Sequence, residues 1–263
     1  MTAVVVREAT EPLLQAGRKR IDDSLARAVR AGKLDEGERD AALARISFDT
    51  GWEAMADRQL VVEAVTEDAA AKVDVFRQLD RVVTAADSVL ASNTSSIPIM
   101  KLAMATGRPA QVVGIHFFNP VPVLRLVELV TSLLTGEETV ARAEAFVTAG
   151  LGKRVIRSQD RAGFVVNALL VPYLLSAIRM FESGFASRDD IDNGMIEGCA
   201  HPMGPLALSD LIGLDTTMAV AESLYEEFKE PLFAPPPLLS RMVEANLLGR
   251  KTGRGFYDYA RRP

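Results

Sequence analysis

A side chain that can act as a general base near neutral pH is rare in this chain, because the sequence contains only 2 histidines. His116 ends the apolar run 112–115, and the segment 117–122 that follows is rich in turn residues. In an α/β sheet, ligands bind at the carboxyl ends of the strands. His116 is therefore the candidate base. His201 precedes Pro-Met-Gly-Pro, and we interpret it as part of a structural turn.

Glu128 is the only acid inside the apolar stretch 126–130. A buried carboxylate needs a hydrogen-bond partner, and a nearby imidazole can be that partner. The carboxylate would then fix the tautomer of the imidazole and raise its base strength. Spacing alone leaves two interpretations open. Either Glu128 pairs with His116, or it faces water from an edge strand while His116 is a core histidine with other partners.

Alternating strands and helices must position these residues. We expect strands at 3–6, 60–65, 88–92, 112–118, 125–130 and 154–158, with helices at 12–33, 36–46, 70–83, 99–105 and 137–151 between them. This alternation predicts a doubly wound parallel sheet. From residue 163 the pattern is almost wholly helical, with expected helices at 164–183, 188–199, 206–212, 216–228 and 238–246. We place the domain boundary near Asp160, between an α/β domain at 1–160 and an all-α domain at 161–263.

Composition narrows the class of protein. The chain has 263 residues, 48% of them hydrophobic, which suits two domains with their own cores. A net charge of −5 with scattered basic residues argues against nucleic acid or an anionic membrane as partner. The single cysteine, Cys199, excludes an internal disulfide and a thiolate metal cluster, so we expect no metal. No signal peptide or membrane span is seen, which predicts a cytoplasmic protein.

Seven short motifs follow one another along nearly the whole chain. They are Ser92-Asn93-Thr94-Ser95-Ser96, His116-Phe117-Phe118-Asn119-Pro120-Val121-Pro122, Glu128, Gly163-Phe164-Val165-Val166-Asn167, Pro202-Met203-Gly204-Pro205, Gly213-Leu214-Asp215-Thr216 and Lys251-Thr252-Gly253-Arg254-Gly255-Phe256-Tyr257. In this order and spacing they closely resemble the L-3-hydroxyacyl-CoA dehydrogenase family. The series carries the resemblance, rather than any single motif.

The resemblance implies a Rossmann-like NAD-binding domain followed by a helical domain that supplies substrate contacts and a homodimer interface. It implies oxidation of an L-3-hydroxyacyl-CoA, such as 3-hydroxybutyryl-CoA, to the 3-oxoacyl-CoA in fatty acid or butanoate metabolism. His116 would take the proton of the substrate 3-hydroxyl, and Glu128 would orient the imidazole. Ser95 and Asn167 would donate hydrogen bonds to the substrate oxygen. Ala168 stands where relatives commonly carry arginine.

The resemblance also marks binding positions. Glu8 matches the acid that accepts hydrogen bonds from the adenosine ribose, which favours NAD over NADP. Other positions that would line the cofactor site are Ala64, Glu67, Lys72, Asn93, Asn119 and Lys251. Substrate contacts would come from Ser24, Ser95, Asn119 and Asn167, with Ser24 facing coenzyme A. Lys72 and Glu67 also fit an ordinary helix surface, and the basic residues Arg27, Arg30 and Lys33 fit either coenzyme A phosphates or a solvated face.

One family feature is missing, the glycine-rich loop after the first strand that approaches the cofactor pyrophosphate. The first glycines are Gly17, Gly32 and Gly51, and we expect none of them to follow a strand. The sheet would then lack its central strand, which belongs between 3–6 and 60–65. We expect that the natural product starts upstream of Met1. Alternatively, the strand at 3–6 occupies the central position.

Two other functions compete with the leading one. A catalytically silent homologue could keep the fold and bind acyl-CoA without holding NAD. A related dehydrogenase could act on a free hydroxy acid or sugar acid. The adjacent Phe117 and Phe118 and the helix that carries Ser24 favour an acyl-CoA substrate.

Overall fold

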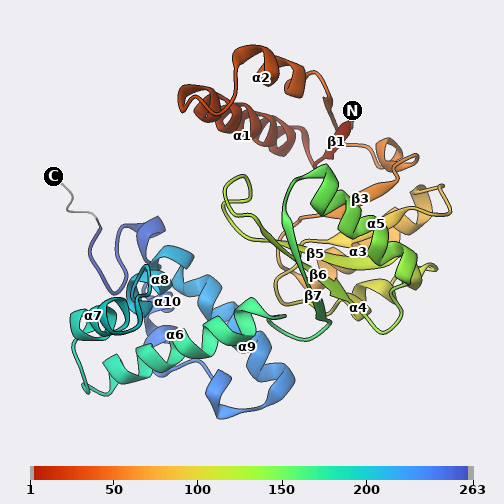
Figure 1. Ribbon diagram of the computed structural model, residues 1–263. Coiled ribbons are helices and arrows are strands. Elements are labelled where there is room, and N and C mark those ends of the chain that lie inside the picture. Colours follow the sequence, from red (N-terminus) through yellow and green to blue (C-terminus); the bar gives the residue numbers. More distant parts are fainter. Residues whose placement is uncertain (1–2, 260–263) are drawn as a thin grey trace.

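The computed structural model describes residues 3–259 and contains two sheets in that range. The first sheet pairs β1 (Val4–Arg7) with β2 (Ile46–Asp49) in parallel. The second has the order β3-β4-β5-β6-β7. Its strands are β3 (Leu60–Glu63), β4 (Val89–Ser92), β5 (Val112–Phe117), β6 (Leu126–Thr131) and β7 (Arg154–Gln159). The expected Rossmann-like sheet is confirmed (Figure 1).

The larger sheet is mixed rather than wholly parallel. β3, β4 and β5 run parallel, but β6 is antiparallel to β5 and parallel to β7. The connection 118–125 is a hairpin loop, too short for the crossover that parallel neighbours need. The expectation of an all-parallel sheet is therefore corrected at its β6–β7 side.

No ladder joins the two sheets within the described residues, since β1 pairs with β2 and not with β3. The alternative in which β1 occupies the central position is wrong. Apolar packing links the sheets instead, because Val5 on β1 and Val61 on β3 both pack against the same core cluster. The strand β2 was missed because the helix was extended to Ile46, although Ile46-Ser47-Phe48-Asp49 alternates between half-buried and exposed. Gly51 therefore does follow a strand, which corrects the expectation for this glycine.

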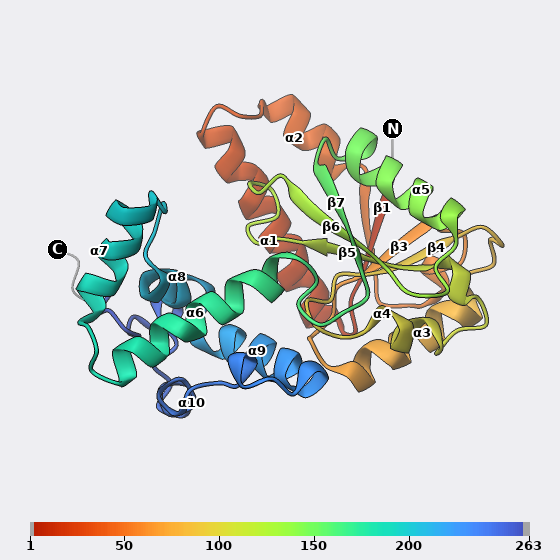
Figure 2. The ribbon, with the colours of Figure 1, turned by 60° about the horizontal axis from the view of Figure 1, so that its bottom comes forward.

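Five α-helices accompany the two sheets in the α/β part of the described chain. They are α1 (Glu11–Arg30), α2 (Glu36–Leu43), α3 (Ala69–Val82), α4 (Ile99–Ala103) and α5 (Glu137–Ala145), which a π-helical turn at Phe146–Gly150 extends. Phe76 and Leu79 of α3 join Ile99 and Leu102 of α4 in one core cluster. The helix α5 packs against the other face of the larger sheet through Ala143, together with Val147 of the π-helical turn. The helices α1 and α2 project beyond the sheet beside β1 (Figures 1 and 2).

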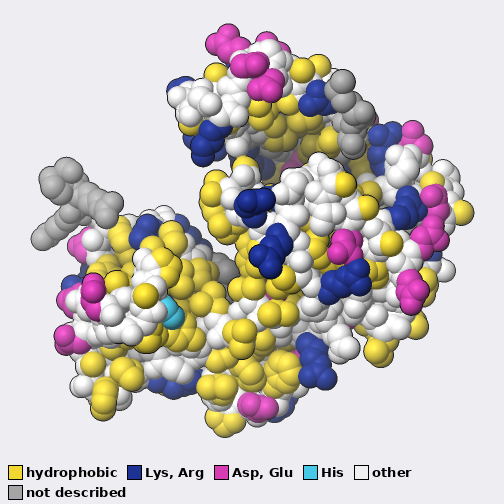
Figure 3. Space-filling model, viewed as in Figure 1, with side chains coloured by type: hydrophobic (Ala, Val, Ile, Leu, Met, Phe, Trp, Pro, Cys, Tyr) yellow, Lys and Arg dark blue, Asp and Glu magenta, His cyan; other side chains and the backbone are white. Residues whose placement is uncertain are grey.

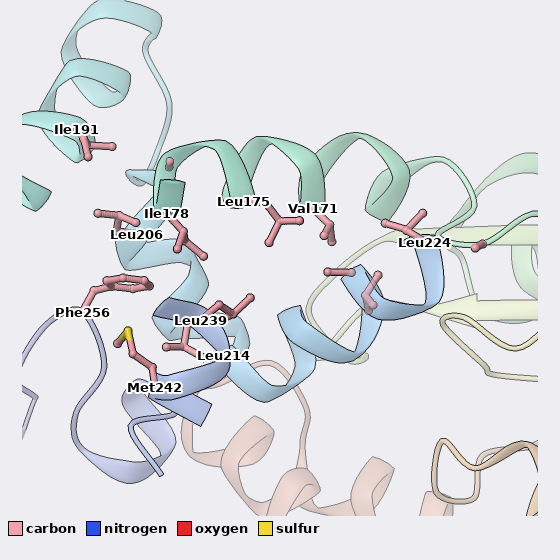
Figure 4. Close-up of a cluster of buried hydrophobic side chains, with 14 residues drawn as sticks. Val171, Leu175, Ile178, Ile191, Leu206, Leu214, Leu224, Leu239, Met242 and Phe256 are labelled. Atoms are coloured by element: carbon pink, nitrogen blue, oxygen red, sulfur yellow. The ribbon is translucent and has the colours of Figure 1, made fainter. Parts of the chain in front are cut away.

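The described residues from Val166 onward form a separate helical layer. Its helices are α6 (Val166–Glu182), α7 (Arg188–Cys199), α8 (Pro205–Ile212), α9 (Leu214–Phe228) and α10 (Pro237–Glu244). Val171, Leu175 and Ile178 recur at helical spacing on α6 and pack toward Leu214 and Leu239 (Figure 4). No helix in the described range is both long and apolar enough to cross a bilayer.

The segment 249–259 closes this helical domain by docking on a buried carboxylate. Asp210 accepts hydrogen bonds from the backbone N–H groups of Phe256 and Tyr257 and from the Tyr259 hydroxyl. Burial raises the pKa of Asp210. Burial and the neighbouring Asp210 carboxylate raise the pKa of Tyr259 to about 12. Gly255 lies so close that an added Cβ would come within 2.0 Å of Asp210 Oδ1. The docking therefore needs a glycine at this position.

Candidate active site

The strands β5 and β6 hold His116 and Glu128 directly opposite each other in their antiparallel ladder. His116 is 5% exposed and Glu128 is 0% exposed. The imidazole Nδ1 lies 2.7 Å from Glu128 Oε2. β6 is an interior strand between β5 and β7, so Glu128 does not face water from an edge. Of the two interpretations left open by the sequence, the structure shows the pair.

The second oxygen of Glu128 binds the start of the helical domain. Oε1 accepts hydrogen bonds from the backbone N–H groups of Val165 and Val166, at 3.0 and 2.9 Å. An ionised carboxylate only accepts hydrogen bonds, so the His116 nitrogen that faces Glu128, Nδ1, carries a hydrogen and donates it. The other ring nitrogen, Nε2, then carries the free lone pair. It lies 3.2 Å from Ser95 Oγ, which places an acceptor nitrogen beside a hydroxyl.

Glu67 organises the turn that carries Ser95. Its Oε1 accepts hydrogen bonds from the Thr94 and Ser96 hydroxyls at 2.6 and 3.0 Å and from the backbone N–H groups of Ser95 and Ser96 at 2.8 and 3.0 Å. Burial raises the pKa of Glu67, but the hydrogen bonds of this turn and the charge of Lys72 outweigh it, and the pKa lies below the ordinary glutamate value. The structure thus gives Glu67 a definite task beside Ser95 that an ordinary helix surface would not have.

Lys72 is buried in a network that the sequence interpretation missed. Its Nζ donates to Glu63 Oε1 at 2.7 Å and lies 3.4 Å from Glu67, while the side chain is only 1% exposed. Glu63 Oε2 accepts from the Ser92 hydroxyl at 2.6 Å. The reading of Lys72 as solvated helix surface is therefore wrong. The signal for Glu63 was present, because it is an acid at the end of an apolar strand, like Glu128 within β6.

Three asparagines were proposed for the site, and the structure places them differently. Asn93 bridges two strand ends, since its Oδ1 accepts from the Phe117 N–H at 2.9 Å and its own N–H donates to Glu63 O. Asn119 is exposed and precedes a cis proline, Pro120. Asn167 is half-buried in the first turn of α6, directly after the Val166 N–H that binds Glu128. The side-chain amide of Asn167 has no hydrogen-bond partner among residues 3–259, so this group remains available to a ligand.

Two aromatic rings flank the imidazole. The ring centroid of Phe118 lies 4.7 Å from that of His116, and that of Phe164 lies 5.5 Å away in an edge-on arrangement. Phe164 adopts a positive φ of 49°, which is unusual for a residue other than glycine. Aromatic contacts thus accompany the polar contacts of His116 with Glu128 and Ser95.

The cofactor positions fit the ribose part of NAD. Glu8 follows β1 at the carboxyl edge, is half-buried, and its carboxylate has no partner within the described range. Ala64 follows β3 at the equivalent edge and is exposed. Gly51 follows β2, but it precedes a single 3-10 turn (Glu53–Met55) rather than a glycine-rich loop and helix. Residues 3–259 thus offer a carboxylate that can accept hydrogen bonds from ribose hydroxyls, but no glycine-rich loop that could bind a pyrophosphate.

Lys251 and Ser24 lie away from the His116 cluster. Lys251 is in the helical domain, where its Nζ forms an ion pair with Asp215 at 2.5 Å. Burial raises the pKa of Asp215, but the hydrogen bonds from Lys251 outweigh it and lower the pKa. Ser24 is half-buried on α1, and the basic residues Arg27 and Arg30 lie exposed in the last turn of that helix. The structure brings none of these residues into contact with His116.

His201 has a structural environment. It follows Ala200, which has a left-handed conformation with φ of 56° at the end of α7. Its Nδ1 lies 3.1 Å from the Tyr173 hydroxyl on α6. This is the turn that the sequence indicated.

A histidine at the carboxyl edge of a Rossmann-like sheet, hydrogen-bonded to a buried carboxylate, is an arrangement that suits a nicotinamide-dependent dehydrogenase. Comparison with known proteins specifies the family. The NAD-binding domain of 3-hydroxyacyl-CoA dehydrogenase matches residues 2–161, and the C-terminal domain of the same enzyme matches residues 163–259. The chain belongs to the 3-hydroxyacyl-CoA dehydrogenase family, oxidoreductases that act on a CH–OH group with NAD as cofactor.

Individual relatives are similar over almost the whole chain. A 3-hydroxybutyryl-CoA dehydrogenase of Mycobacterium tuberculosis is 62% identical over 97% of this chain and 90% of its own length. The human mitochondrial hydroxyacyl-coenzyme A dehydrogenase is 40% identical over 97% of this chain and 83% of its own. The crystal structure of (S)-3-hydroxybutyryl-CoA dehydrogenase from Ralstonia eutropha superimposes with a TM-score of 0.93 at 44% identity, covering 98% of this chain and 91% of that one.

Proposed function

We propose that this protein interconverts L-3-hydroxybutyryl-CoA and acetoacetyl-CoA with NAD, and that His116 is the general base. The observation that carries the proposal is the hydrogen-bonded series from Glu128 through His116 to Ser95 at the carboxyl edge of the sheet. The choice of a four-carbon substrate rests on the relatives named 3-hydroxybutyryl-CoA dehydrogenase.

Oxidation of an alcohol removes a proton and a hydride from the same carbinol, and bound NAD supplies the hydride acceptor. The chain supplies the proton acceptor. His116 Nε2 receives the proton of the 3-hydroxyl, and Glu128 at Nδ1 stabilises the imidazolium that forms. Ser95 Oγ, 3.2 Å from Nε2, donates a hydrogen bond to the substrate oxygen. Asn167, with its free amide in the first turn of α6, provides a second donor.

The cofactor positions follow the same assignment. Glu8 accepts the ribose hydroxyls and repels a 2′-phosphate, which gives a preference for NAD over NADP. Ala64, Asn93 and Asn119 line the cofactor at the strand ends, and Glu67 and Lys72 support the turn beside it. Ser24 on α1 faces the coenzyme A part of the substrate. Lys251 is also proposed to contact the cofactor. Its ammonium group would then bind the cofactor and Asp215 at the same time.

The same proposal extends to the assembly and setting of the protein. The helical domain exposes apolar side chains that a second copy would cover, including Leu169 at 73%, Phe185 at 78% and Met180 at 41% exposure. Figure 3 shows hydrophobic side chains gathered over this domain. We therefore include a homodimer formed by the domain that we assign to 161–263, and a cytoplasmic role in fatty acid metabolism.

The test is oxidation of NADH with acetoacetyl-CoA, compared with free acetoacetate and with NADPH. We expect turnover with acetoacetyl-CoA and NADH, and much weaker turnover in the other two pairings. His116→Gln should lower kcat by roughly 100-fold to 10,000-fold because the proton loses its acceptor. His201→Gln is the matched control and should retain activity.

Three results would contradict the proposal. Normal turnover in His116→Gln would exclude the mechanism. Preference for free acetoacetate would favour the dehydrogenase of a free acid. Binding of acetoacetyl-CoA without turnover in the wild type would favour the silent homologue.

A further inference from the structure

The link between the two domains, residues 160–166, is fixed by three carboxylates, one of its own and two from outside it. Asp160, at the start of the link, accepts the backbone N–H groups of Ile99 and Met100 at 2.8 and 2.7 Å. Glu227 on α9 accepts the N–H of Ala162 at 3.0 Å. Glu128 then accepts the two N–H groups at the start of α6. The link is therefore held over its whole length, and its last anchor is the partner of His116.

Two consecutive residues in this link have left-handed backbone conformations. Gly163 has φ of 74° and Phe164 has φ of 49°. At Gly163 an added Cβ would lie 2.9 Å from the backbone N of Ala168 and 2.9 Å from a methyl group of Leu224. A side chain at this position is thus excluded both by the backbone conformation and by space. For Phe164 the conformation is strained, and such strain concentrates at functional sites.

The result of this turn is a pair of N–H groups aimed at one oxygen. α6 lacks a side-chain cap from its own N-cap residue, Val165, so Glu128 takes that position from a neighbouring strand. The same turn places the Phe164 ring against the imidazole of His116. The turn therefore contacts both members of the pair, Glu128 through backbone N–H groups and His116 through the Phe164 ring.

We propose that Gly163 and Phe164 are positioning residues of the catalytic site, which rests on the function proposed above. Their left-handed turn directs two backbone N–H groups to Glu128 Oε1, which fixes the carboxylate as an acceptor whose Oε2 faces His116. The carboxylate in turn holds the proton of His116 on Nδ1 and leaves Nε2 free toward Ser95. The backbone at the start of the helical domain thereby selects the tautomer of the base in the other domain.

A turn with a merely structural role would stabilise the link without affecting the imidazole. The two roles are separated by Gly163→Ala and the matched control Gly184→Ala. Gly184 also has a left-handed conformation, with φ of 71°, but an added Cβ there meets nothing within 4 Å. Both variants carry similar backbone strain, and only Gly163→Ala displaces the N–H groups from Glu128.

The measurements are NADH-dependent kinetics with acetoacetyl-CoA and the NMR spectrum of ring-¹⁵N-labelled histidine in the full chain. The spectrum holds only 2 histidines, and His201→Gln assigns them. We expect Gly163→Ala to lower kcat roughly 10- to 100-fold with KM for both substrates nearly unchanged. The His116 Nδ1–H proton signal should move upfield or be lost. Gly184→Ala should keep the wild-type kcat and spectrum.

An unchanged His116 signal in folded Gly163→Ala would overturn the proposal, whatever its activity. So would equal losses of kcat in both glycine variants. If the wild type gives no turnover, the proposed function fails, and the NMR comparison still decides whether this turn positions His116.

Discussion

Carboxylates with several donors build this site residue by residue. Glu63 neutralises the buried Lys72, and Glu67 gathers the turn of Ser95 around one oxygen. Glu128 combines an imidazole with two backbone N–H groups. Each carboxylate fixes the direction of a neighbouring donor, so the position of Ser95 and the tautomer of His116 are set before substrate arrives.

Glu67→Gln should lower the free energy of unfolding by about 1 kcal/mol at neutral pH, with allowance for solvent screening at a partly exposed carboxylate. The pKa of Glu67 is lowered in the folded protein, so its stabilisation is complete above the ordinary glutamate pKa. It declines as the pH falls from about 5 toward and through the lowered pKa. Urea unfolding across this range should show the difference between wild type and variant shrinking with acidity. Glu197→Gln, an exposed position on α7, should show no such trend, and a pH-independent difference at Glu67 would contradict the assignment.

Local patterns predicted most elements of the fold, and tertiary pairing accounts for the rest. The boundaries of α7 were predicted correctly from the helical pattern, and in the structure the Ser187 side chain caps its first turn. The short strand β2 was absorbed into a helix, and the direction of β6 depends on a hairpin loop rather than on the strand residues. His116 and Glu128 were singled out by their chemistry, whereas their pairing stayed open until the family resemblance favoured it. The task of Glu67 beside Ser95 depends on residues 27 to 29 positions apart, which no local pattern reveals.

At the scale of elements, the segment 249–259 depends on its contact with Asp210 on α8. Gly255→Ala should lower the free energy of unfolding by about 1–3 kcal/mol, because the added methyl group overlaps Asp210. Chemical denaturation measures the change. Gly194→Ala on α7 is the control, since an added Cβ there meets nothing within 4 Å and alanine favours helix. Equal stability of the two variants would show that the segment is not held by this contact.

At the scale of the molecule, the exposed side chains of α6 and its C-terminal turn are expected to lie in a dimer interface. Leu169→Glu combined with Phe185→Asp should raise the dimer dissociation constant at least about tenfold, because charges would be buried against a second copy. Sedimentation velocity over a concentration series measures this change. Leu133→Glu, at a 95% exposed position beyond β6, should leave the association unchanged. A wild-type protein that stays monomeric throughout would reject the interface.

The absence of a ladder between β1 and β3 has a consequence for how ligand binding and chemistry are linked. The part formed by β1, α1, α2 and β2 carries Glu8, and it is attached to the larger sheet by packing of Val5 rather than by backbone hydrogen bonds between strands. Local opening of this part would break no hydrogen bond of the β5–β6 ladder, which holds the His116–Glu128 pair. With Glu8 as the proposed ribose acceptor, the apparent affinity for NAD would scale with the fraction of molecules in which this part is closed, whereas the rate of proton transfer would not. Under the proposed function, we therefore expect cofactor affinity and catalytic rate to change independently.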